Sequence, residues 1–482
     1  MSDAAADRRR SDELGAVDVL MHRGEANPRT RSGITTVEIL DVTPDWERYR
    51  RCFEVASRQV VRLRQKVVTP TLPTTSPRWV VDPDFSLDYH VRRMRVPEPG
   101  RLRQVLDIAE IGVQSPLDIS RPLWTATLVE GLAGGQAASI LHFSHAVTDG
   151  LGGVEMFAHL YDLERDPPQR RLPPAPVPQD LSPRDLMREG IGRLPLTLAG
   201  GVAGAVVGTA KAVGRSVRAP GSLVGGAIDY ARSGARVVTQ AAEPSPLLRR
   251  RSLASRSEAI DMDLGDLHRA AKAAGGSVND AYLAGLCGAL RRYHVALGVP
   301  IATLPMAVPV NLRAEDDAAG GNRFAGVNIA APIGEADPAV RITKVRRQMT
   351  QRREERALDV IGSVAPVLSV LPAAVLEAMT GSVISADVQA SNVPVYQGDT
   401  FVAGAKILRQ YGIGPLPGVA MMVVLLSRGG VCTVTVRYDR AAVTKEGLFA
   451  RCLQEGFDEV LALAGDPPPR VTPASFGDEE HP

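Results

Sequence analysis

The sequence predicts an α/β protein with two domains, on three observations. A chain of 482 residues is too long to fold around one ordinary core. Strand-like stretches, such as 33–40 and 431–438, and stretches with helical periodicity, such as 45–63 and 278–297, occur in both halves. A cluster of prolines at 167–183 shows no periodicity and is typical of a linker between two folded units.

Composition narrows the class of protein. Hydrophobic residues make up 44% of the chain, which is typical of a globular protein. A formal net charge of +2, without a basic patch interleaved with aromatic residues, gives no reason to expect nucleic acid as a partner. Residues 1–13 are polar and no apolar h-region follows, so we expect a frayed tail and no secretory signal. The cysteines lack C-x-x-C spacing, which argues against a zinc knuckle or disulfide scaffold and favours a reducing cytoplasm: Cys52, Cys287, Cys432 and Cys452.

The first domain is expected to end in a hairpin that presents a histidine. In order, the patterns predict a first element at 14–20, a strand at 33–40, a helix at 45–63 and a strand entered after Pro122. The glycine-rich turn 131–135 would join that last strand to another at 137–143. The hairpin would aim His145 outward.

Residues 137–157 hold the residue types suited to catalysis. The strand ends just before His145, Asp149 and Gly150 follow in a turn, and a helical pattern begins after them. His145 is the candidate general base, because an unperturbed imidazole titrates near ~6.5 and can accept a proton from a hydroxyl. Asp149 would fix the loop through backbone N–H groups or an arginine, and Gly150 would permit a close approach. The alternative is a buried histidine with satisfied hydrogen bonds, beside an ordinary turn into a helix.

Two other chemistries are less favoured by the same residues. His142, His145 and Asp149 could ligate a metal, but the two histidines would point to opposite faces of a strand and no fourth ligand is near, so no metal is expected. Ser144 could be a nucleophile, yet it lacks the flanking glycines of a nucleophile elbow.

The region after the linker is basic. Residues 186–251 hold ten Arg and Lys residues against three Asp and Glu residues, a net charge of +7. Within them, 194–210 carries no charge but is short, glycine-rich and interrupted by Pro195, which places it at the lower limit for a membrane span. We expect helices that dock on the protein or lie on an anionic lipid surface; the alternative is a solvated basic helix pair. Liposome flotation at low and high salt distinguishes these cases.

The second domain is expected to begin near Ser252. A helix at 264–274 would stop at two glycines, and Ser277 and Asp280 are spaced as a capping box that opens a helix at 278–297. Asn279 and Asp280 would then lie in the first turn of that helix, and capping is their structural explanation. Further on, strands at 419–426 and 431–438 would form a hairpin, and the proline-rich, acidic end would be disordered.

The hexapeptide His145 to Gly150, of the form His-x-x-x-Asp-Gly, resembles the active-site signature of the CoA-dependent acyltransferase superfamily. That superfamily includes chloramphenicol acetyltransferase, the condensation domains of peptide synthetases and the wax ester synthase/diacylglycerol acyltransferase family. Most condensation and wax ester members have a second histidine directly before the first one of the motif, and this chain has Ser144 there. This replacement keeps the candidate base, His145, but removes the histidine that usually precedes it.

Further blocks are similar to the wax ester synthase/diacylglycerol acyltransferase family and occur in the same order. They are the block 79–92 with its Trp, Asp-Pro-x-Phe and Tyr-His, the block Pro122-Leu123-Trp124, the block at Asn279-Asp280, the block 309–313 ending in Arg313, the block 321–324, and the block Ser391-Asn392-Val393-Pro394. Together the resemblance covers residues 14–465. A buried anchor for a hairpin is the physical role expected of Trp124 in either case.

This resemblance implies two similar α/β halves, each like chloramphenicol acetyltransferase, with mixed sheets and an active-site tunnel between them. The domains would be a disordered tail at 1–13, a first acyltransferase subdomain at 14–165, the linker and basic helical segment at 166–251, a second subdomain at 252–465 and a disordered tail at 466–482.

The resemblance also implies a mechanism. His145 would take the proton of a hydroxyl whose oxygen attacks the thioester of acyl-CoA, without a covalent acyl-enzyme and without a further cofactor. Asn392 and the backbone near Ser391 are candidates for stabilising the oxyanion, with Asn279 and Asp280 as further candidates. Arg313 is a candidate partner for Asp149.

The acceptor would be a diacylglycerol or a long-chain alcohol. Alternatives are a secondary-metabolite or polyketide hydroxyl, amide formation, or a lipid-binding relative with little catalysis. The expected location is the cytoplasm, with peripheral contact to the inner membrane or to lipid droplets through residues 186–251.

Overall fold

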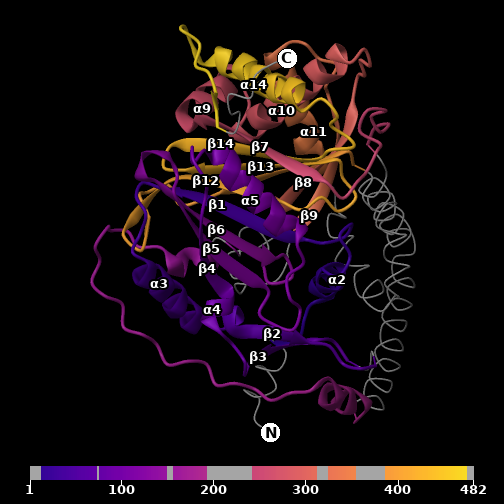
Figure 1. Cartoon of the computed structure of the whole chain (residues 1–482). Helices are drawn as coiled ribbons and strands as arrows, with labels where there is room; N and C mark the ends of the chain where they lie inside the picture. Colours follow the sequence, from indigo (N-terminus) through magenta and orange to yellow (C-terminus); the bar gives the residue numbers. More distant parts are fainter. Residues whose placement is uncertain are drawn as a thin grey trace, which may run out of the picture.

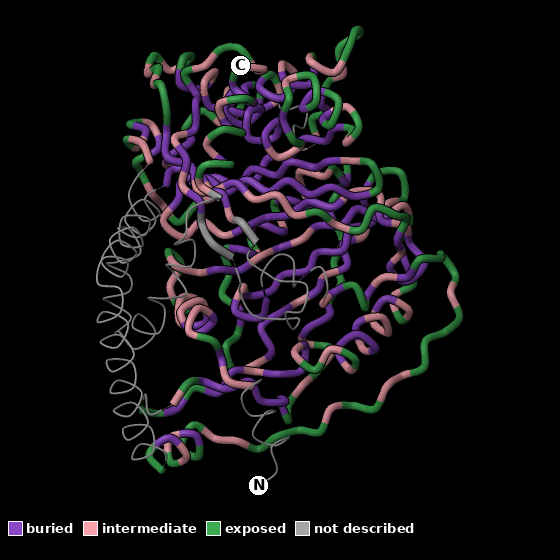
Figure 2. The backbone as a smooth tube through the Cα atoms, turned by 180° about the vertical axis from the view of Figure 1, so that it is seen from behind, coloured by how far each residue is buried: buried purple, intermediate pink, exposed green. Residues whose placement is uncertain are grey.

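The computed structural model describes residues 12–72, 75–148, 153, 156–192, 241–311, 324–353 and 386–474. Two large β-sheets lie next to each other, and helices cover the outer side of each (Figure 1). Buried residues are concentrated in the sheets and in the helix faces that pack on them (Figure 2). Among the described residues, no helix is both long enough and apolar enough to cross a membrane.

The first sheet has six strands and confirms the predicted hairpin. Its order is β11 (Phe401–Val402), β12 (Ala405–Ile413), β1 (Gly33–Leu40), β6 (Ala137–Ser144), β5 (Trp124–Glu130) and β4 (Val91–Arg95). Strands β5 and β6 pair antiparallel across a turn in which Gly131, Gly134 and Gly135 all have positive φ, a conformation that favours glycine. Strand β6 then pairs with β1, so that Ser144 lies opposite Gly33.

Helices and a small second hairpin surround this sheet. They are α2 (Ala16–Gly24), α3 (Trp46–Gln59), α4 (Leu87–His90), α5 (Leu102–Gln114) and the strand pair β2 (Gln65–Val68) and β3 (Arg78–Val81). Trp124 is the buried anchor expected of it. Its indole Nε1 donates to the carbonyl of Leu63 at 2.7 Å, and its ring stacks between Phe53 and His90. Pro122 and Leu123 are buried beside it.

The second sheet has seven strands. Its order is β15 (Thr472–Pro473), β7 (Ser255–Asp263), β14 (Val431–Asp439), β13 (Met421–Arg428), β10 (Val388–Pro394), β8 (Leu304–Asn311) and β9 (Phe324–Ala331). The predicted hairpin of β13 and β14 is confirmed. Among the described residues, four helices cover its outer face: α9 (Leu264–Ala273), α10 (Val278–Ala296), α11 (Pro338–Arg353) and α14 (Glu446–Leu461). The capping box of α10 is confirmed, because Ser277 and Asp280 each bond the other's backbone N–H.

The chain leaves the second sheet once and returns to it. After β10, residues 401–413 form β11 and β12 in the first sheet, where β12 pairs antiparallel with β1, and β13 then rejoins the second sheet. The expected division at 252–465 is therefore wrong at this point, because part of that segment completes the other half. Burial is the physical reason, since Ile407, Tyr411 and Ile413 of β12 join the cores of the first half.

The end of the chain also differs from expectation. Residues 466–474, within the tail expected to be disordered, are described, and β15 pairs with β7. Burial of Val471 and hydrogen bonds from its N–H to Asp458 and from the N–H of Ala474 to the carbonyl of Ala259 hold this segment on the sheet.

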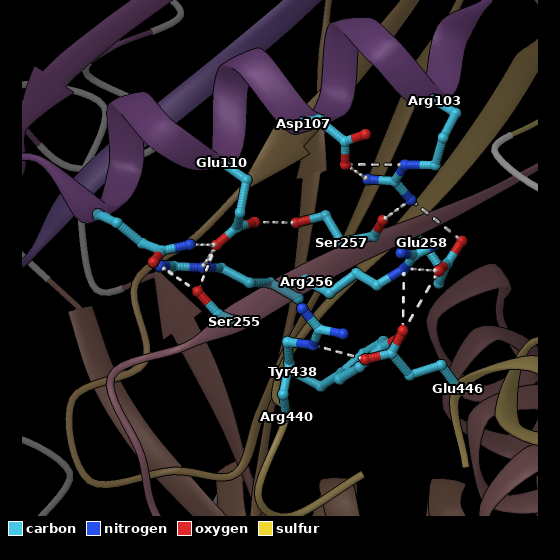
Figure 3. A network of polar contacts seen from close by, with 12 residues as sticks. Arg103, Asp107, Glu110, Ser255, Arg256, Ser257, Glu258, Tyr438, Arg440 and Glu446 are labelled. Carbon is cyan, nitrogen blue, oxygen red and sulfur yellow. Dashed lines mark hydrogen bonds and ion pairs between the residues drawn. The ribbon is translucent and has the colours of Figure 1, made fainter. Parts of the chain in front are cut away.

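A buried polar network joins the two halves along α5 (Figure 3). Glu110 accepts hydrogen bonds from Arg437 on β14 at 2.9 Å and from the hydroxyls of Ser255 and Ser257 on β7. About two turns earlier on α5, Arg103 donates to the carbonyl of Ser257 at 2.6 Å. Burial alone would raise the pKa of Glu110, but Arg437 and the two serines outweigh it and leave this pKa below its usual value.

Candidate active site

A cavity of about 180 Å³ lies where the two sheets meet. The first sheet, the second sheet and the crossing strand β12 all contribute to its lining, which is mostly apolar with a few polar groups. The lining includes Ile34, Thr36, Leu141, Phe143, His145, Phe157, Tyr161, Gln389, Ser391, Asn392, Gln410, Gly412, Ile413, Met422, Val424 and Leu426. Such a lining is typical of a site that holds an apolar ligand and orients it through a few polar contacts.

His145 is held in this lining by its backbone neighbours. Strand β6 ends at Ser144, the N–H of His145 donates to the carbonyl of Ser32 at 3.2 Å, and the N–H of Val147 donates to the carbonyl of Ser144 at 3.0 Å. The turn after β6 is thus fixed on both sides of the histidine. The residue lines a cavity to which both halves contribute, which is what the tunnel hypothesis requires.

Ser144, which replaces the first histidine of the usual pair, has a structural partner. Its hydroxyl is fully buried and donates to Oε1 of Glu25 at 2.7 Å, while the N–H of Ala146 donates to the same hydroxyl at 3.2 Å. Burial raises the pKa of Glu25, and the hydrogen bonds from Ser144 and Ser32 act against that rise. Ser144 is not part of the cavity lining.

His142 faces away from the cavity. Its Nδ1 lies 2.7 Å from Oγ1 of Thr35 and 3.1 Å from the carbonyl oxygen of Ile34. Burial lowers its pKa from 6.5 to about 4, so the ring is neutral at neutral pH. Within the described part of the chain, His, Cys, Asp and Glu side chains form no group of three that could hold a metal.

This lowered pKa predicts an acid-labile contribution to stability. The pKa of His142 is about 4 in the folded chain and near 6.5 when unfolded, so unfolding takes up a proton between these values and stability falls as pH decreases through that window. Between pH 7.5 and pH 5 this costs roughly 2 kcal/mol. Urea unfolding of wild type and His142→Gln at both pH values measures the difference. An equal pH dependence in both proteins would contradict the assignment.

Strand β10 brings the predicted oxyanion candidates to the same cavity. Ser391 and Asn392 both line it, and the side-chain amide of Asn392 lies 3.4 Å from Oδ1 of Asn279. Asn279 is thus next to a lining residue without lining the cavity itself. Asp280 is not in the lining, and its Oδ2 accepts hydrogen bonds from the N–H and hydroxyl of Ser277 at 2.8 Å each. This is the capping role that the sequence predicted for Asp280. Asp149, Gly150 and Arg313 lie outside the described residues.

A polar cluster at this cavity was not found from the sequence. Tyr161 and Gln410 line the cavity, and both donate to the fully buried Glu38 of β1, Gln410 at 3.2 Å. Arg428 donates to Oε1 of Gln410 at 3.4 Å. Burial raises the pKa of Glu38, and the charge of Arg428 acts in the opposite direction. A glutamate inside the otherwise uncharged strand 33–40 is the one sequence signal that points to this cluster.

The fold is the two-domain fold of a wax ester synthase/diacylglycerol acyltransferase and of a condensation domain whose structures are solved. The structure superposes on the wax ester synthase/diacylglycerol acyltransferase from Marinobacter aquaeolei VT8 with a TM-score of 0.63 and 18% identity, covering 94% of this chain and 100% of that one. The first condensation domain of the CDA synthetase gives a TM-score of 0.58 and 17% identity, covering 96% and 98%. At these identities the likeness concerns the fold.

The sequence then identifies the family. A family model described as the wax ester synthase/diacylglycerol acyltransferase catalytic domain matches residues 7–282, and one described as the WS/DGAT C-terminal domain matches residues 320–460. The chain belongs to the wax ester synthase/diacylglycerol acyltransferase family and is an acyltransferase.

Two relatives come from Mycobacterium tuberculosis (strain ATCC 25618 / H37Rv). "Putative diacyglycerol O-acyltransferase Rv2484c" is 72% identical, over 99% of this chain and 97% of the relative. "Putative diacyglycerol O-acyltransferase Rv3087" is 30% identical, over 74% of this chain and 76% of the relative. The resemblance stated from the motifs is confirmed by these matches.

Proposed function

We propose that the chain transfers a fatty acyl group from acyl-CoA to the hydroxyl of a diacylglycerol or a long-chain alcohol, with His145 as the general base. The observation that supports this most is the position of His145 in a mostly apolar cavity to which both halves contribute. Membership of the family and the names of the relatives support the same reaction.

The proposed reaction needs one base and one set of donors. His145 takes the hydroxyl proton, and the hydroxyl oxygen forms a bond to the thioester carbonyl carbon. Asn392 and Ser391, which line the same cavity, donate to the oxyanion that develops. The carbon–sulfur bond then breaks, and the protonated His145 returns its proton to the sulfur of the departing CoA.

The lining favours a lipid acceptor over a small polar one. Apolar side chains from both sheets, such as Phe143, Met422 and Leu426, line most of the cavity. Tyr161 and Gln410 add a polar end, where hydroxyl or ester groups of an acceptor find hydrogen-bonding partners.

The test uses the purified chain with radiolabelled palmitoyl-CoA and a panel of diacylglycerol, hexadecanol, ethanol and glycerol. We expect labelled ester and free CoA in equal amounts with the lipid acceptors and little product with the small ones. Saturable lipid binding without ester formation from any acceptor would favour the alternative of a lipid-binding relative.

Peripheral contact with a membrane or lipid droplet stays a prediction. Residues 193–240, which carry most of the basic segment, lie outside the described residues. The flotation experiment with anionic vesicles tests this prediction directly.

A further inference from the structure

A second cavity, of about 540 Å³, lies beside the cavity of His145. The two share a boundary along the chain: Gly33 lines the second cavity and Ile34 the first, and Pro415 lines the first and Leu416 the second. A side chain at Gly33 would place its Cβ 2.7 Å from the His142 ring, and one at Gly414 would place it 2.7 Å from Met422. At this boundary a Cβ on either glycine would require His142 or Met422 to move.

Five arginines line the second cavity and give it a strong positive charge. They are Arg29, Arg31, Arg249, Arg251 and Arg437. They come from the loop before β1, from the segment before β7 and from β14. The one carboxylate in the lining, Asp439, already accepts hydrogen bonds from the N–H and hydroxyl of Ser252 and from the N–H of Ala441.

The five arginines differ in how deeply they are buried and in which groups they contact. Arg437 is buried and paired with Glu110. Arg31 and Arg251 are half-buried and donate mainly to backbone carbonyls, which position a guanidinium without neutralising it. Arg29 and Arg249 are exposed, and within the described residues their guanidinium groups form no hydrogen bond or ion pair. Four positive charges thus remain without a carboxylate partner at hydrogen-bond distance among these residues.

A third hollow on the molecule shows the contrast. Arg101, Arg103 and Arg409 line it, and two of the three have carboxylate partners: Arg103 is paired with Asp107 and Glu258, and Arg409 is paired with Asp261. The charge there is largely neutralised within the protein. The second cavity differs because the guanidinium groups of its exposed arginines, Arg29 and Arg249, form no hydrogen bond or ion pair with the described residues.

We propose that the second cavity binds the phosphates of the CoA nucleotide, an inference that rests on the proposed function. Arginine donors suit phosphate oxygens in both charge and geometry. With the phosphates at the arginines, the pantetheine arm crosses the glycine boundary at Gly33 and Gly414 and delivers the thioester to His145. The apolar cavity takes the acyl chain, so the two cavities match the two chemical ends of one substrate.

The test compares Arg29→Gln/Arg249→Gln, which removes two positive charges, with Arg250→Gln, which removes one from an exposed neighbour outside the lining. We expect the double variant to raise KM for palmitoyl-CoA at least tenfold with little change in kcat, and to leave KM for palmitoyl-pantetheine, which lacks the nucleotide, unchanged. Arg250→Gln should resemble wild type with both donors. An equal rise in KM for both donors would overturn the proposal.

Calorimetric binding of CoA, adenosine 3′,5′-bisphosphate, inorganic phosphate and anionic vesicles to the same proteins separates this inference from the proposed function. Arginine-dependent binding of CoA and of the bisphosphate supports the nucleotide site even if no acyl transfer is detected. CoA affinity that is unchanged in the double variant overturns it. Loss of vesicle binding with intact CoA binding would assign the arginines to a lipid headgroup and also overturn it.

Discussion

Replacing His145 with alanine is expected to lower kcat for acyl transfer by about a hundredfold or more, which is the usual share of general-base catalysis. The imidazole lines the cavity, and its backbone is fixed by hydrogen bonds that do not involve the side chain. The variant should therefore fold normally and still bind both substrates, so that KM changes little.

The measurement is steady-state release of CoA with a diacylglycerol acceptor, together with the melting temperature of each protein. His159→Ala is the matched control, because His159 is an exposed histidine that does not line the cavity. Turnover of His145→Ala within a few-fold of wild type would remove this residue from the reaction.

Replacing Glu110 with glutamine is expected to lower the free energy of unfolding by about 3–5 kcal/mol, as breaking a buried ion pair typically does. The side chains of Glu110 and Arg437 are each 8% exposed, so removal of the carboxylate leaves a buried guanidinium without its counter-ion. The loss is large because this pair also joins α5 of one half to β14 of the other.

Asp107→Asn is the control for this experiment. Asp107 lies on the same helix and is paired with Arg103, but its side chain is 57% exposed, and exposed ion pairs contribute about 0–1 kcal/mol. Urea unfolding of the three proteins gives the comparison. If Glu110→Gln is no less stable than Asp107→Asn, the buried pair does not hold the halves together as described.

The parts of the fold that could be predicted followed mostly from local sequence patterns. The strand at 33–40, the hairpin that ends at Ser144 and the capping box at Ser277 depend on neighbours in the sequence, and the structure confirms each of them. The path of β12 could not be predicted in the same way. Its partner β1 lies far away in the sequence, and its apolar pattern fits either half equally well.

The same distinction between local patterns and distant partners applies to the candidate site. The motif located His145, and the family block located Ser391 and Asn392, which the structure places around one cavity; their catalytic roles stay predictions. Glu25 and Glu38 were missed, because each becomes meaningful only through a distant partner: Ser144 for the first, and Gln410 for the second. Burial of a carboxylate cannot be read from a sequence before the residues that cover it are known.

The path of β12 limits how such enzymes can be recombined. A chimera that takes residues 252–465 from one relative and the rest from another would import β11 and β12 as a foreign edge of the recipient's six-stranded sheet, with β12 directly against β1. Exchange of acceptor specificity between relatives should therefore succeed only when β1 and β12 travel as a pair, although more than 360 residues separate them in the sequence.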